Sequence, residues 1–323
     1  MMNVLILSCG TRYKLVKYFT SNRNCVDKVV VTDCSKDAPA LYVADKYYIV
    51  PRMDSPDYTD TLVDICKKEN IDIIIPLHED EIILIAKIRS IFEEIGVMVA
   101  LSDYEKIKLC RDKLNLNNYL ADAGIQSVPT YKAEDYCESS GDRINVFAKP
   151  RAGAGSVDTF HVHSKKLLEA LIEEYNEQLI VQPDMSGREY GVDVYVDMMS
   201  NEIISCFCKE KLRMRAGETE KSVTDMNASV IELVSRAVKK IGLVGPLDVD
   251  VMEHNGQYSI LEINPRFGGG YPHAYECGAN FIELICTNAS GHANEKINTE
   301  YKHRRVLKLS LIHISEPTRL DVI

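Results

Sequence analysis

Leu261-Glu262-Ile263-Asn264-Pro265-Arg266 precedes a run of glycines, Gly268-Gly269-Gly270. Glu262 and Asn264 lie two residues apart, so on a β-strand their side chains point to the same face. Another acid, Asp250, lies twelve residues before Glu262 in an apolar, strand-like run. Carboxylate and carboxamide oxygens are ligands that Mg²⁺ prefers, and arginine is suited to binding phosphate. The stretch therefore predicts a pair of strands that carries a magnesium–phosphate site, which indicates a protein that uses ATP.

The turn between these two strands, His254-Asn255-Gly256, decides whether Asp250 and Glu262 share a face. A two-residue Asn-Gly turn pairs residue 250 with residue 261 and puts the two acids on opposite faces. A three-residue loop with Gly256 in the left-handed conformation pairs 250 with 260 and 248 with 262. Four oxygen-bearing side chains then lie on one face: Asp248, Asp250, Glu262 and Asn264. We expect the three-residue loop, because this set suits a metal site better than the alternative, a solvated hairpin face.

The composition is that of a globular protein large enough for two domains. Of 323 residues, 46% are apolar and 27% are charged, and the net charge is −10. This acidic balance argues against a general nucleic-acid-binding protein. The ten cysteines are scattered and form no metal knuckle, and no secretory signal or membrane span is apparent. These observations predict a cytoplasmic protein with mostly free thiols and no membrane partner.

The first hundred residues alternate between strand and helix patterns. Apolar runs predict strands at 4–7, 29–32, 47–50, 71–76 and 97–100, and helical patterns cover 58–68 and 80–94. This order predicts a parallel sheet with helices on both faces and a binding rim at the carboxyl ends of its strands. Gly10-Thr11-Arg12, Asp33 and His78-Glu79-Asp80-Glu81 are expected at that rim. A nicotinamide-binding site is disfavoured, because Ser8-Cys9-Gly10-Thr11 lacks the three-glycine fingerprint.

After Leu101 the pattern changes to strands with fewer intervening helices. Strands are predicted at 128–131, 146–150, 180–183, 190–197 and 202–208, and helices at 114–123, 165–177 and 227–241. The fold class is thus α/β at the N-terminus and α+β in the C-terminal part. Residues 308–323 do not continue the pattern and resemble translated vector sequence, so they are left out of the functional reasoning. The alternative for this tail is an ordinary terminal strand.

Three further groups of residues suit a nucleotide, although each has a plain structural alternative. Lys149 precedes a small-residue loop with Gly155 and Ser156, whose backbone could approach phosphate oxygens; small-residue loops are also common without a ligand. Gln182-Pro183-Asp184 offers an extended backbone for an adenine edge, with Glu189 for the ribose, or it is only a surface linker. Residues 209–224, which include Arg213 and Arg215, form a cationic lid or a solvated loop.

Taken in order, these motifs resemble the ATP-grasp superfamily, above all the ATP-binding half of the carbamoyl-phosphate synthase large chain and related carboxylate–amine ligases. The resemblance is strongest for residues 245–250 and 262–269, and is good at Asp112-Lys113, Lys149-Pro150 and 187–190. It implies an N-terminal Rossmann-like pre-ATP-grasp domain (1–101) and a two-lobed ATP-grasp domain (102–307). The small lobe would be about 113–183 and the metal-binding lobe about 184–290.

The resemblance also implies a role for each matching residue. Phosphate contacts would come from Lys113, Lys149, Gly155 and Ser156. Adenine and ribose contacts would come from Gln182, Pro183, Asp184 and Glu189. Two Mg²⁺ ions, with Mn²⁺ as an alternative ion, would be bound by Asp250, Glu262 and Asn264. Arg266 would stabilise the transferred phosphoryl group, and Arg213 and Arg215 would lie in a substrate-side loop. The family often has a carboxylate in the hinge where this chain has Gln182-Pro183, so the side-chain contact to adenine differs.

The activity implied is that of a ligase that phosphorylates a carboxylate and joins it to an amine or ammonia. Such a reaction needs positioning and charge neutralisation rather than a protein nucleophile. Carbamoyl-phosphate synthesis from bicarbonate is the alternative within this class, although it consumes two ATP and the length suits one ATP-grasp unit. A non-catalytic ATP-binding protein is the alternative outside it. The expected partners are small-molecule substrates, with a homodimer as the default assembly.

Overall fold

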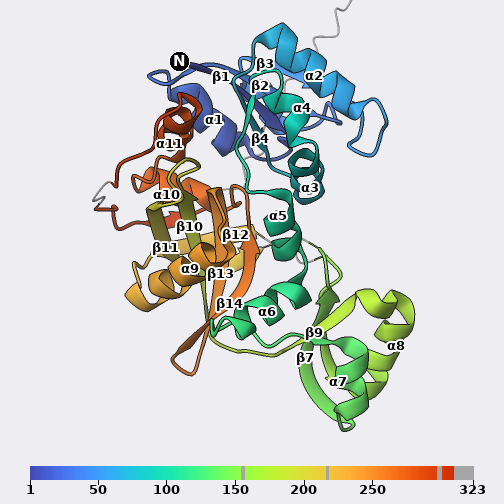
Figure 1. The fold of residues 1–323 in the computed structure, drawn as a ribbon. Helices are drawn as coiled ribbons and strands as arrows, with labels where there is room; N and C mark the ends of the chain where they lie inside the picture. Colours follow the sequence, from blue (N-terminus) through green and yellow to red (C-terminus); the bar gives the residue numbers. More distant parts are fainter. Residues whose placement is uncertain (154–156, 216–217, 297–299, 309–323) are drawn as a thin grey trace, which may run out of the picture.

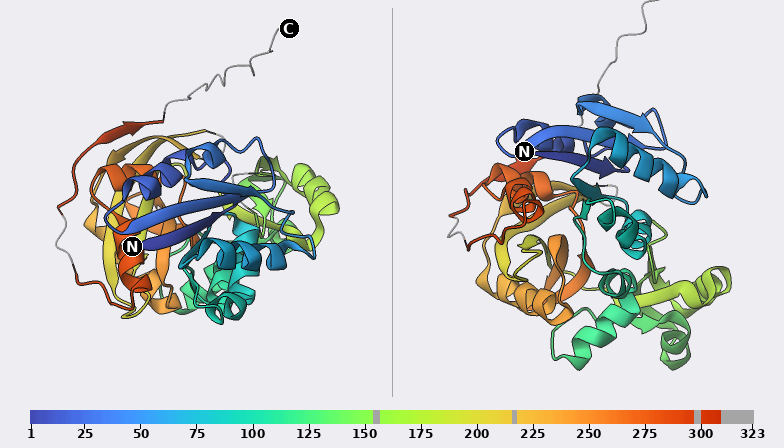
Figure 2. Two further views of the ribbon diagram at one scale, coloured as in Figure 1. Left: turned by 90° about the horizontal axis from the view of Figure 1, so that it is seen from above. Right: turned by 45° about the horizontal axis from the view of Figure 1, so that its top comes forward.

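The computed structural model describes residues 1–153, 157–215, 218–296 and 300–308. Three β-sheets organise this part of the chain into three lobes, one above the other two (Figures 1 and 2). The N-terminal lobe is an α/β unit with a parallel sheet, and the other two contain antiparallel sheets. The predicted fold class is therefore confirmed. In the described part, no helix is long and apolar enough to cross a membrane.

The N-terminal lobe contains a five-stranded sheet in the order β3-β2-β1-β4-β5, parallel throughout. Its strands are β1 (Met2–Leu7), β2 (Val26–Asp33), β3 (Lys46–Ile49), β4 (Ile73–Pro76) and β5 (Met98–Val99). Its helices are α1 (Tyr13–Ser21), the short 3-10 helix η1 (Pro39–Val43), α2 (Tyr58–Glu69), α3 (Glu79–Lys87) and α4 (Arg89–Glu93). The helix predicted over 80–94 is in fact two, because the chain leaves the helical conformation at Ile88.

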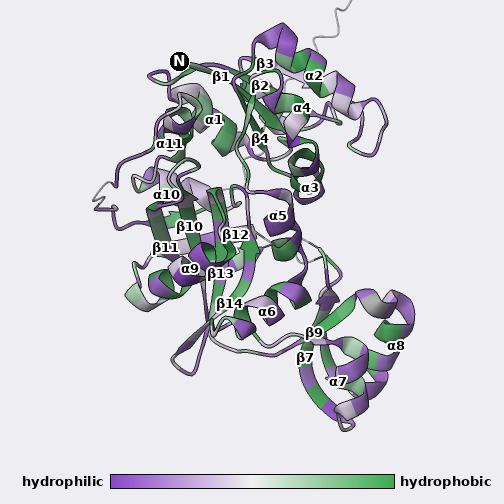
Figure 3. Ribbon diagram, viewed as in Figure 1, coloured by the Kyte–Doolittle hydropathy of each residue, from purple (hydrophilic) through white to green (hydrophobic). Residues whose placement is uncertain are grey.

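Both faces of this sheet are buried, which explains why its strands are apolar without alternation. Val4 and Ile6 of β1 pack with α1, whereas Leu5 and Leu7 pack on the opposite face, against α2 and α3. The hydropathy colouring shows hydrophobic strands in the interior, with hydrophilic residues along the outer face of α2 (Figure 3).

The small lobe is a four-stranded antiparallel sheet in the order β6-β9-β7-β8. Its elements are β6 (Tyr131–Lys132), α7 (Ala133–Ser139), β7 (Arg143–Pro150), β8 (Phe160–Ser164), α8 (Lys165–Tyr175), η2 (Asn176–Gln178) and β9 (Leu179–Pro183). Helices α5 (Tyr104–Arg111) and α6 (Lys113–Asp122) lead into it from the first lobe. The lobe has a small core of its own between α7, α8 and the sheet.

The third lobe is a six-stranded sheet in the order β14-β13-β10-β11-β12-β15. Its elements are β10 (Arg188–Val196), β11 (Ile203–Arg215), β12 (Glu218–Thr224), α9 (Ala228–Ile241), β13 (Gly245–His254), β14 (Gln257–Asn264), α10 (Tyr271–Glu276), α11 (Phe281–Ala289) and β15 (Arg305–Leu307). Residues 209–224, expected as a loop, form much of a β-hairpin, because β11 continues to Arg215 and pairs with β12. The solvated-loop interpretation of the described part of this stretch is therefore wrong, and the cationic lid stays a prediction.

The side chains of β10 alternate between the two faces of this sheet. Val192 and Val194 pack against α9 in one core, whereas Glu189, Gly191 and Asp193 point to the other face. The face toward α9 is thus apolar. The other face carries the polar side chains of Glu189 and Asp193, and Tyr195 further along it packs in a second hydrophobic core.

The β13–β14 hairpin corrects the predicted turn. Its loop is the two-residue Asn255-Gly256, with φ of 52° and 78°, and His254 pairs with Gln257. The three-residue loop and its pairing of 250 with 260 and 248 with 262 are wrong. An irregularity between Asp250 and Val251 leaves Leu261 as an extra residue in β14, so Asp250 pairs with Glu262 and Asp248 with Asn264. The β-bulge, not the turn, puts the oxygen-bearing side chains on one face.

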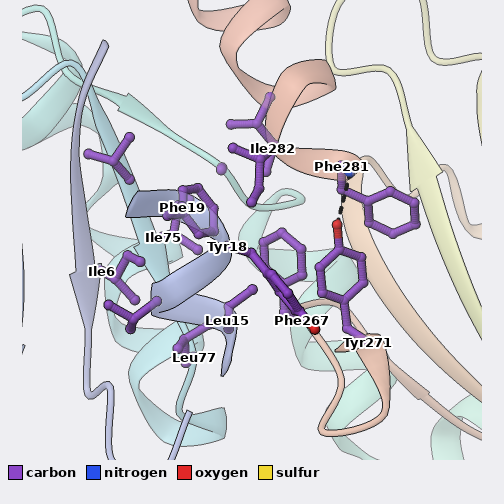
Figure 4. Packing of buried hydrophobic residues seen from close by; sticks show 14 of the residues in the cluster. Ile6, Leu15, Tyr18, Phe19, Ile75, Leu77, Phe267, Tyr271, Phe281 and Ile282 are labelled. Carbon is purple, nitrogen blue, oxygen red and sulfur yellow. Dashed lines mark hydrogen bonds between the residues drawn. The ribbon is translucent and has the colours of Figure 1, made fainter. Parts of the chain in front are cut away.

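The first and third lobes share a hydrophobic core. Phe267, directly after Arg266, packs edge-on against Phe19 of α1, with ring centroids 6.0 Å apart. Tyr18 stacks on Tyr275 of α10 at 3.8 Å. Figure 4 shows α1 and the sheet of the first lobe on one side of this cluster, with Tyr271 and Phe281 on the other. Segments more than 200 residues apart in sequence are thus fixed to each other.

Candidate functional site

A cavity of about 730 Å³ lies where the three lobes meet. The small lobe lines it with Phe147, Lys149, Pro150, Gly153, Gln182 and Pro183. The third lobe lines it with Glu189, Lys209, Lys211, Asp248, Asp250, Glu262, Asn264, Arg266, Gly269 and Gly270. The first lobe lines it with Arg12, Leu77, His78, Glu79 and Asp80. Part of the predicted rim of the parallel sheet therefore faces the same cavity as the predicted metal ligands, whereas Gly10, Thr11, Asp33 and Glu81 are not among its lining residues.

The polar face of β13 and β14 contributes four oxygen-bearing side chains to the cavity: Asp248, Asp250, Glu262 and Asn264. Gly268 has to lack a side chain here, because a Cβ would lie 2.4 Å from the Cγ of Asp248. Among the described residues, no three acidic, histidine or cysteine side chains converge closely enough to hold an ion by themselves. The donor set nevertheless suits Mg²⁺, which is usually held by one or two carboxylates with substrate phosphates and water completing the shell.

Lys211 lies between two of the predicted ligands. Its Nζ is 2.8 Å from Glu189 Oε1 and 2.6 Å from Asp250 Oδ1, and its side chain is 5% exposed. Burial alone would lower the pKa of Lys211, but Asp250, Glu189 and Asp248 outweigh it and raise that pKa above its ordinary value. Lys211 is therefore a permanent positive charge at the carboxylate face, a position that the loop interpretation of residues 209–224 did not reveal.

Two lysines reach the cavity from elements outside the third lobe, Lys113 from α6 and Lys149 from β7. Lys113, the first residue of α6, donates to the Gly153 carbonyl at 2.8 Å and lies 3.7 Å from Glu262 Oε1. The Asp112 side chain caps this helix by accepting from the Asn115 N–H, and it also binds Arg151 through both oxygens at 2.7 Å. The helix start and the adjoining loop thus hold Lys113 beside the cavity.

Lys149, on β7, lines the same cavity and is half-buried. Burial is the main reason that its pKa falls to about 8, and the nearby charge of Lys113 adds to the effect, although Glu262 opposes it. A buried ammonium in a cavity is suited to a phosphate, which would supply the missing negative charge.

Arg266 is held by two carboxylates from different lobes. Its Nη2 donates to Glu79 Oε1 at 2.8 Å, and its Nη1 lies 3.3 Å from Asp248 Oδ2. Glu79, at the start of α3 in the first lobe, also accepts from Arg111. The sequence predicted that Glu79 lies at the rim of the parallel sheet. It did not predict the contact with Arg266, because the two residues are 187 positions apart.

The predicted adenine segment borders the cavity only in part. Gln182 and Pro183 line it, and Gln182 Nε2 donates to Thr130 Oγ1 at 2.9 Å. Asp184 is not among the lining residues; its Oδ2 instead accepts from Asn145 Nδ2 at 3.0 Å and lies 3.1 Å from His161 Nε2. Met185, which the motif analysis did not single out, lines the cavity beside Pro183.

The remaining predicted residues are not brought to the cavity in the described part. Arg213 and Arg215 are exposed on the β11–β12 hairpin and pair with Glu220 at 2.9 and 3.5 Å. Met214 and Thr219 of the same hairpin line the cavity instead. Gly155 and Ser156 lie outside the described residues.

Two family models match the chain: a PylC-like N-terminal domain over residues 4–100 and an ATP-grasp domain over residues 110–270. The chain belongs to the ATP-grasp superfamily. This finding confirms the resemblance inferred from the motifs.

Curated relatives of this ATP-grasp chain are distant. It is 24% identical over 188 residues to the arginine-specific carbamoyl phosphate synthase large chain of Geobacillus stearothermophilus, covering 54% of this chain. The chain spans less than half the length of the curated relatives it matches, 18% of that one and 41% of another.

Solved ATP-grasp structures align over most of the chain. An L-amino acid ligase from Bacillus licheniformis aligns with a TM-score of 0.72 at 15% identity, covering 94% of this chain and 78% of that one. The biotin carboxylase domain of Hydrogenobacter thermophilus 2-oxoglutarate carboxylase, in complex with MgADP and bicarbonate, aligns with a TM-score of 0.71 at 16% identity. This second match covers 93% of this chain and 72% of that one. At such identities the likeness concerns the fold alone.

Proposed function

We propose that this protein joins a carboxylic acid to an amine or ammonia at the expense of ATP, through an acylphosphate. The observation that carries the proposal is the composition of the cavity. Four oxygen donors of β13 and β14 line it, and Lys113 of α6 and Lys149 of β7 line it as well. The division into residues 1–101 and 102–307 is part of the proposal.

Each residue has a role that follows from its charge and place. Asp250, Glu262 and Asn264 would hold Mg²⁺, which supplies charge neutralisation at the phosphates when bound. Two ions, or Mn²⁺ in their place, are part of the same proposal. The predicted phosphate, adenine and ribose contacts are kept, as proposals, for Lys113, Lys149, Gly155, Ser156, Gln182, Pro183, Asp184 and Glu189.

Arg266, held between Glu79 and Asp248, would neutralise the charge that develops on the γ-phosphoryl group as a substrate carboxylate attacks it. The amine then displaces phosphate from the acylphosphate. Arg213 and Arg215, which pair with Glu220 on the β11–β12 hairpin, are kept as proposed substrate-side residues. A homodimer is the proposed assembly; the biotin carboxylase relative was solved as a dimer.

Bicarbonate is the second candidate for the acid. The similarity to a carbamoyl phosphate synthase large chain favours it, although the match covers only 18% of that protein. An amino acid is the first candidate, supported by the alignment with an L-amino acid ligase.

The test is phosphate release from Mg·ATP in the presence of paired amino acids, or of bicarbonate with ammonia. We expect release only when both an acid and an amine are present. The double variant D250N/E262Q should abolish it, whereas D37N/E138Q, which neutralises two exposed acids outside the cavity, should leave it unchanged. Activity that survives in D250N/E262Q would refute the metal assignment, and release that needs no acid would refute the ligase.

A further inference from the structure

Lys209 and Asp193 form a charge pair at the cavity that has no assigned role. Lys209 Nζ donates to Asp193 Oδ2, and each side chain is 1% exposed. Lys209 lines the cavity, whereas Asp193 is not among the lining residues. Removing two charges from water costs several kcal/mol per ion, and an apolar pair of similar size would often be at least as stable. Because burial makes this charge pair costly, we looked for a function that needs it.

The hydrogen bonds of Lys209 are incomplete. An ammonium has three N–H donors, and buried donors are nearly always paired. Among the described residues, Lys209 Nζ has one acceptor, Asp193 Oδ2. Gly270, which lines the cavity, lies against the other side of the ammonium: a Cβ there would be 3.1 Å from Nζ and 2.9 Å from Cε. A side chain at residue 270 would therefore collide with the Lys209 side chain where both residues line the cavity.

Lys209 differs in its contacts from Lys211, which lies two residues further along the same strand. Gly191 lies between them, since its Cβ would be 3.0 Å from Lys211 Cε and 3.3 Å from Lys209 Cε. Lys211 binds Glu189 and Asp250, whereas Lys209 binds Asp193. The two lysines therefore lie close together but bind different carboxylates.

Asp193 pairs with Asp248 across β10 and β13, and Asp248 contacts Arg266, which contacts Glu79 of the first lobe. In the β10–β11 ladder Lys211 pairs with Glu189, the proposed ribose residue, and Lys209 pairs with Gly191. Lys209 thus lies further from Glu189 than Lys211 does, toward the end of the strand pair that carries Asp193 and Asp248.

We propose that Lys209 binds an oxyanion in this part of the cavity, and that this oxyanion is the carboxylate of the acid substrate. The inference rests on the proposed ligase function, because the acid must lie beside the γ-phosphoryl group. Asp193 is the positioning residue that fixes the ammonium. The other oxyanion that Lys209 could bind is the γ-phosphoryl group of ATP. The experiment below distinguishes the carboxylate from the γ-phosphoryl group.

The probe for the carboxylate is trifluoroacetate, whose ¹⁹F line width reports binding. It is titrated with and without saturating Mg·ADP, so the readout does not depend on turnover or on nucleotide binding. The variant is K209M/D193L, which removes both buried charges together, so that neither is left uncompensated. The control is K166M, which removes an exposed lysine of α8. Mg·ADP and Mg·adenylyl imidodiphosphate are titrated calorimetrically on all three proteins.

We expect wild type and K166M to bind trifluoroacetate alike, and K209M/D193L to bind it at least about tenfold more weakly, as for the loss of a charged hydrogen bond. Both nucleotides should bind the double variant as they bind wild type. Selective loss of the imidodiphosphate would assign the oxyanion to the γ-phosphoryl group and overturn the proposal. Trifluoroacetate binding equal to that of wild type, or absent from wild type, would also overturn it. Failure of wild type to bind either nucleotide would instead refute the ligase function.

Discussion

Lys149 shows how burial tunes a single residue for its ligand. With a pKa of about 8, it is mostly protonated at neutral pH and loses its charge at mildly alkaline pH. A phosphate bound beside it would favour the charged form. The affinity for nucleotide should therefore depend on pH in a range where ordinary lysines do not titrate.

The pH dependence of Mg·ADP binding tests this point. Protonated Lys149 binds phosphate, so affinity should be full below pH 8 and should fall as pH rises through that value, by about tenfold between pH 7 and 9. Isothermal titration across this range measures it. K149R stays charged and should bind with little change over the same range. A wild-type affinity that is constant to pH 9 would show that Lys149 does not contact the phosphates.

At the scale of elements, the β-bulge of β14 explains both the success and the failure of the sequence prediction. The pattern of residues 248–264 predicted correctly that four oxygen-bearing side chains share a face. The predicted cause, a three-residue turn, was wrong. Asn255-Gly256 is an ordinary two-residue turn, and the extra residue is Leu261 within β14. A turn has a strong sequence signal in Asn-Gly. The bulge had none that we recognised, since Leu261 is apolar like its neighbours.

The start of α6 makes a separate prediction at this scale. Asp112 caps the helix and pairs with Arg151, and Lys113 follows it directly. D112A removes both interactions and should lower the free energy of unfolding by about 1 kcal/mol for the cap alone. D112N keeps an equally good cap and loses only the charge. Urea denaturation and Mg·ADP titration should rank wild type, D112N and D112A in descending order of stability and affinity. Equal affinity in all three would show that the cap does not position Lys113.

At the scale of the whole molecule, the arrangement of the lobes was beyond the sequence. Alternating strands and helices predicted the parallel sheet, and β11 differed from expectation only in its length. The contacts of Phe19 with Phe267 and of Glu79 with Arg266 join residues about 190 to 250 apart, so no local pattern encodes them. They depend on how complete lobes pack, which is a property of surfaces rather than of motifs.

The contact of Glu79 with Arg266 predicts that the first lobe affects the chemical step. E79Q removes the charge that holds Arg266 and should lower kcat for acid-dependent phosphate release by about tenfold, a charged hydrogen bond being worth 1.5–3 kcal/mol. The dissociation constant of Mg·ADP should change less than about twofold, because Glu79 is not among the proposed nucleotide contacts. E93Q, an exposed acid of α4, is the matched control. A weaker Mg·ADP affinity in E79Q with unchanged kcat would contradict this role.

The part of the cavity lining that comes from the first lobe has a consequence for how the acid substrate of such proteins can change. Arg12 follows β1, and residues 77–80 run from the end of β4 into the first turn of α3; none of them is among the proposed magnesium ligands. These two segments can therefore vary in sequence while the phosphoryl-transfer residues of the third lobe stay intact. Selection for a new acid would act mainly on the two segments, subject to one constraint: Glu79 must keep its contact with Arg266. The lobe with the least conspicuous motifs is thus the one best placed to acquire new substrates.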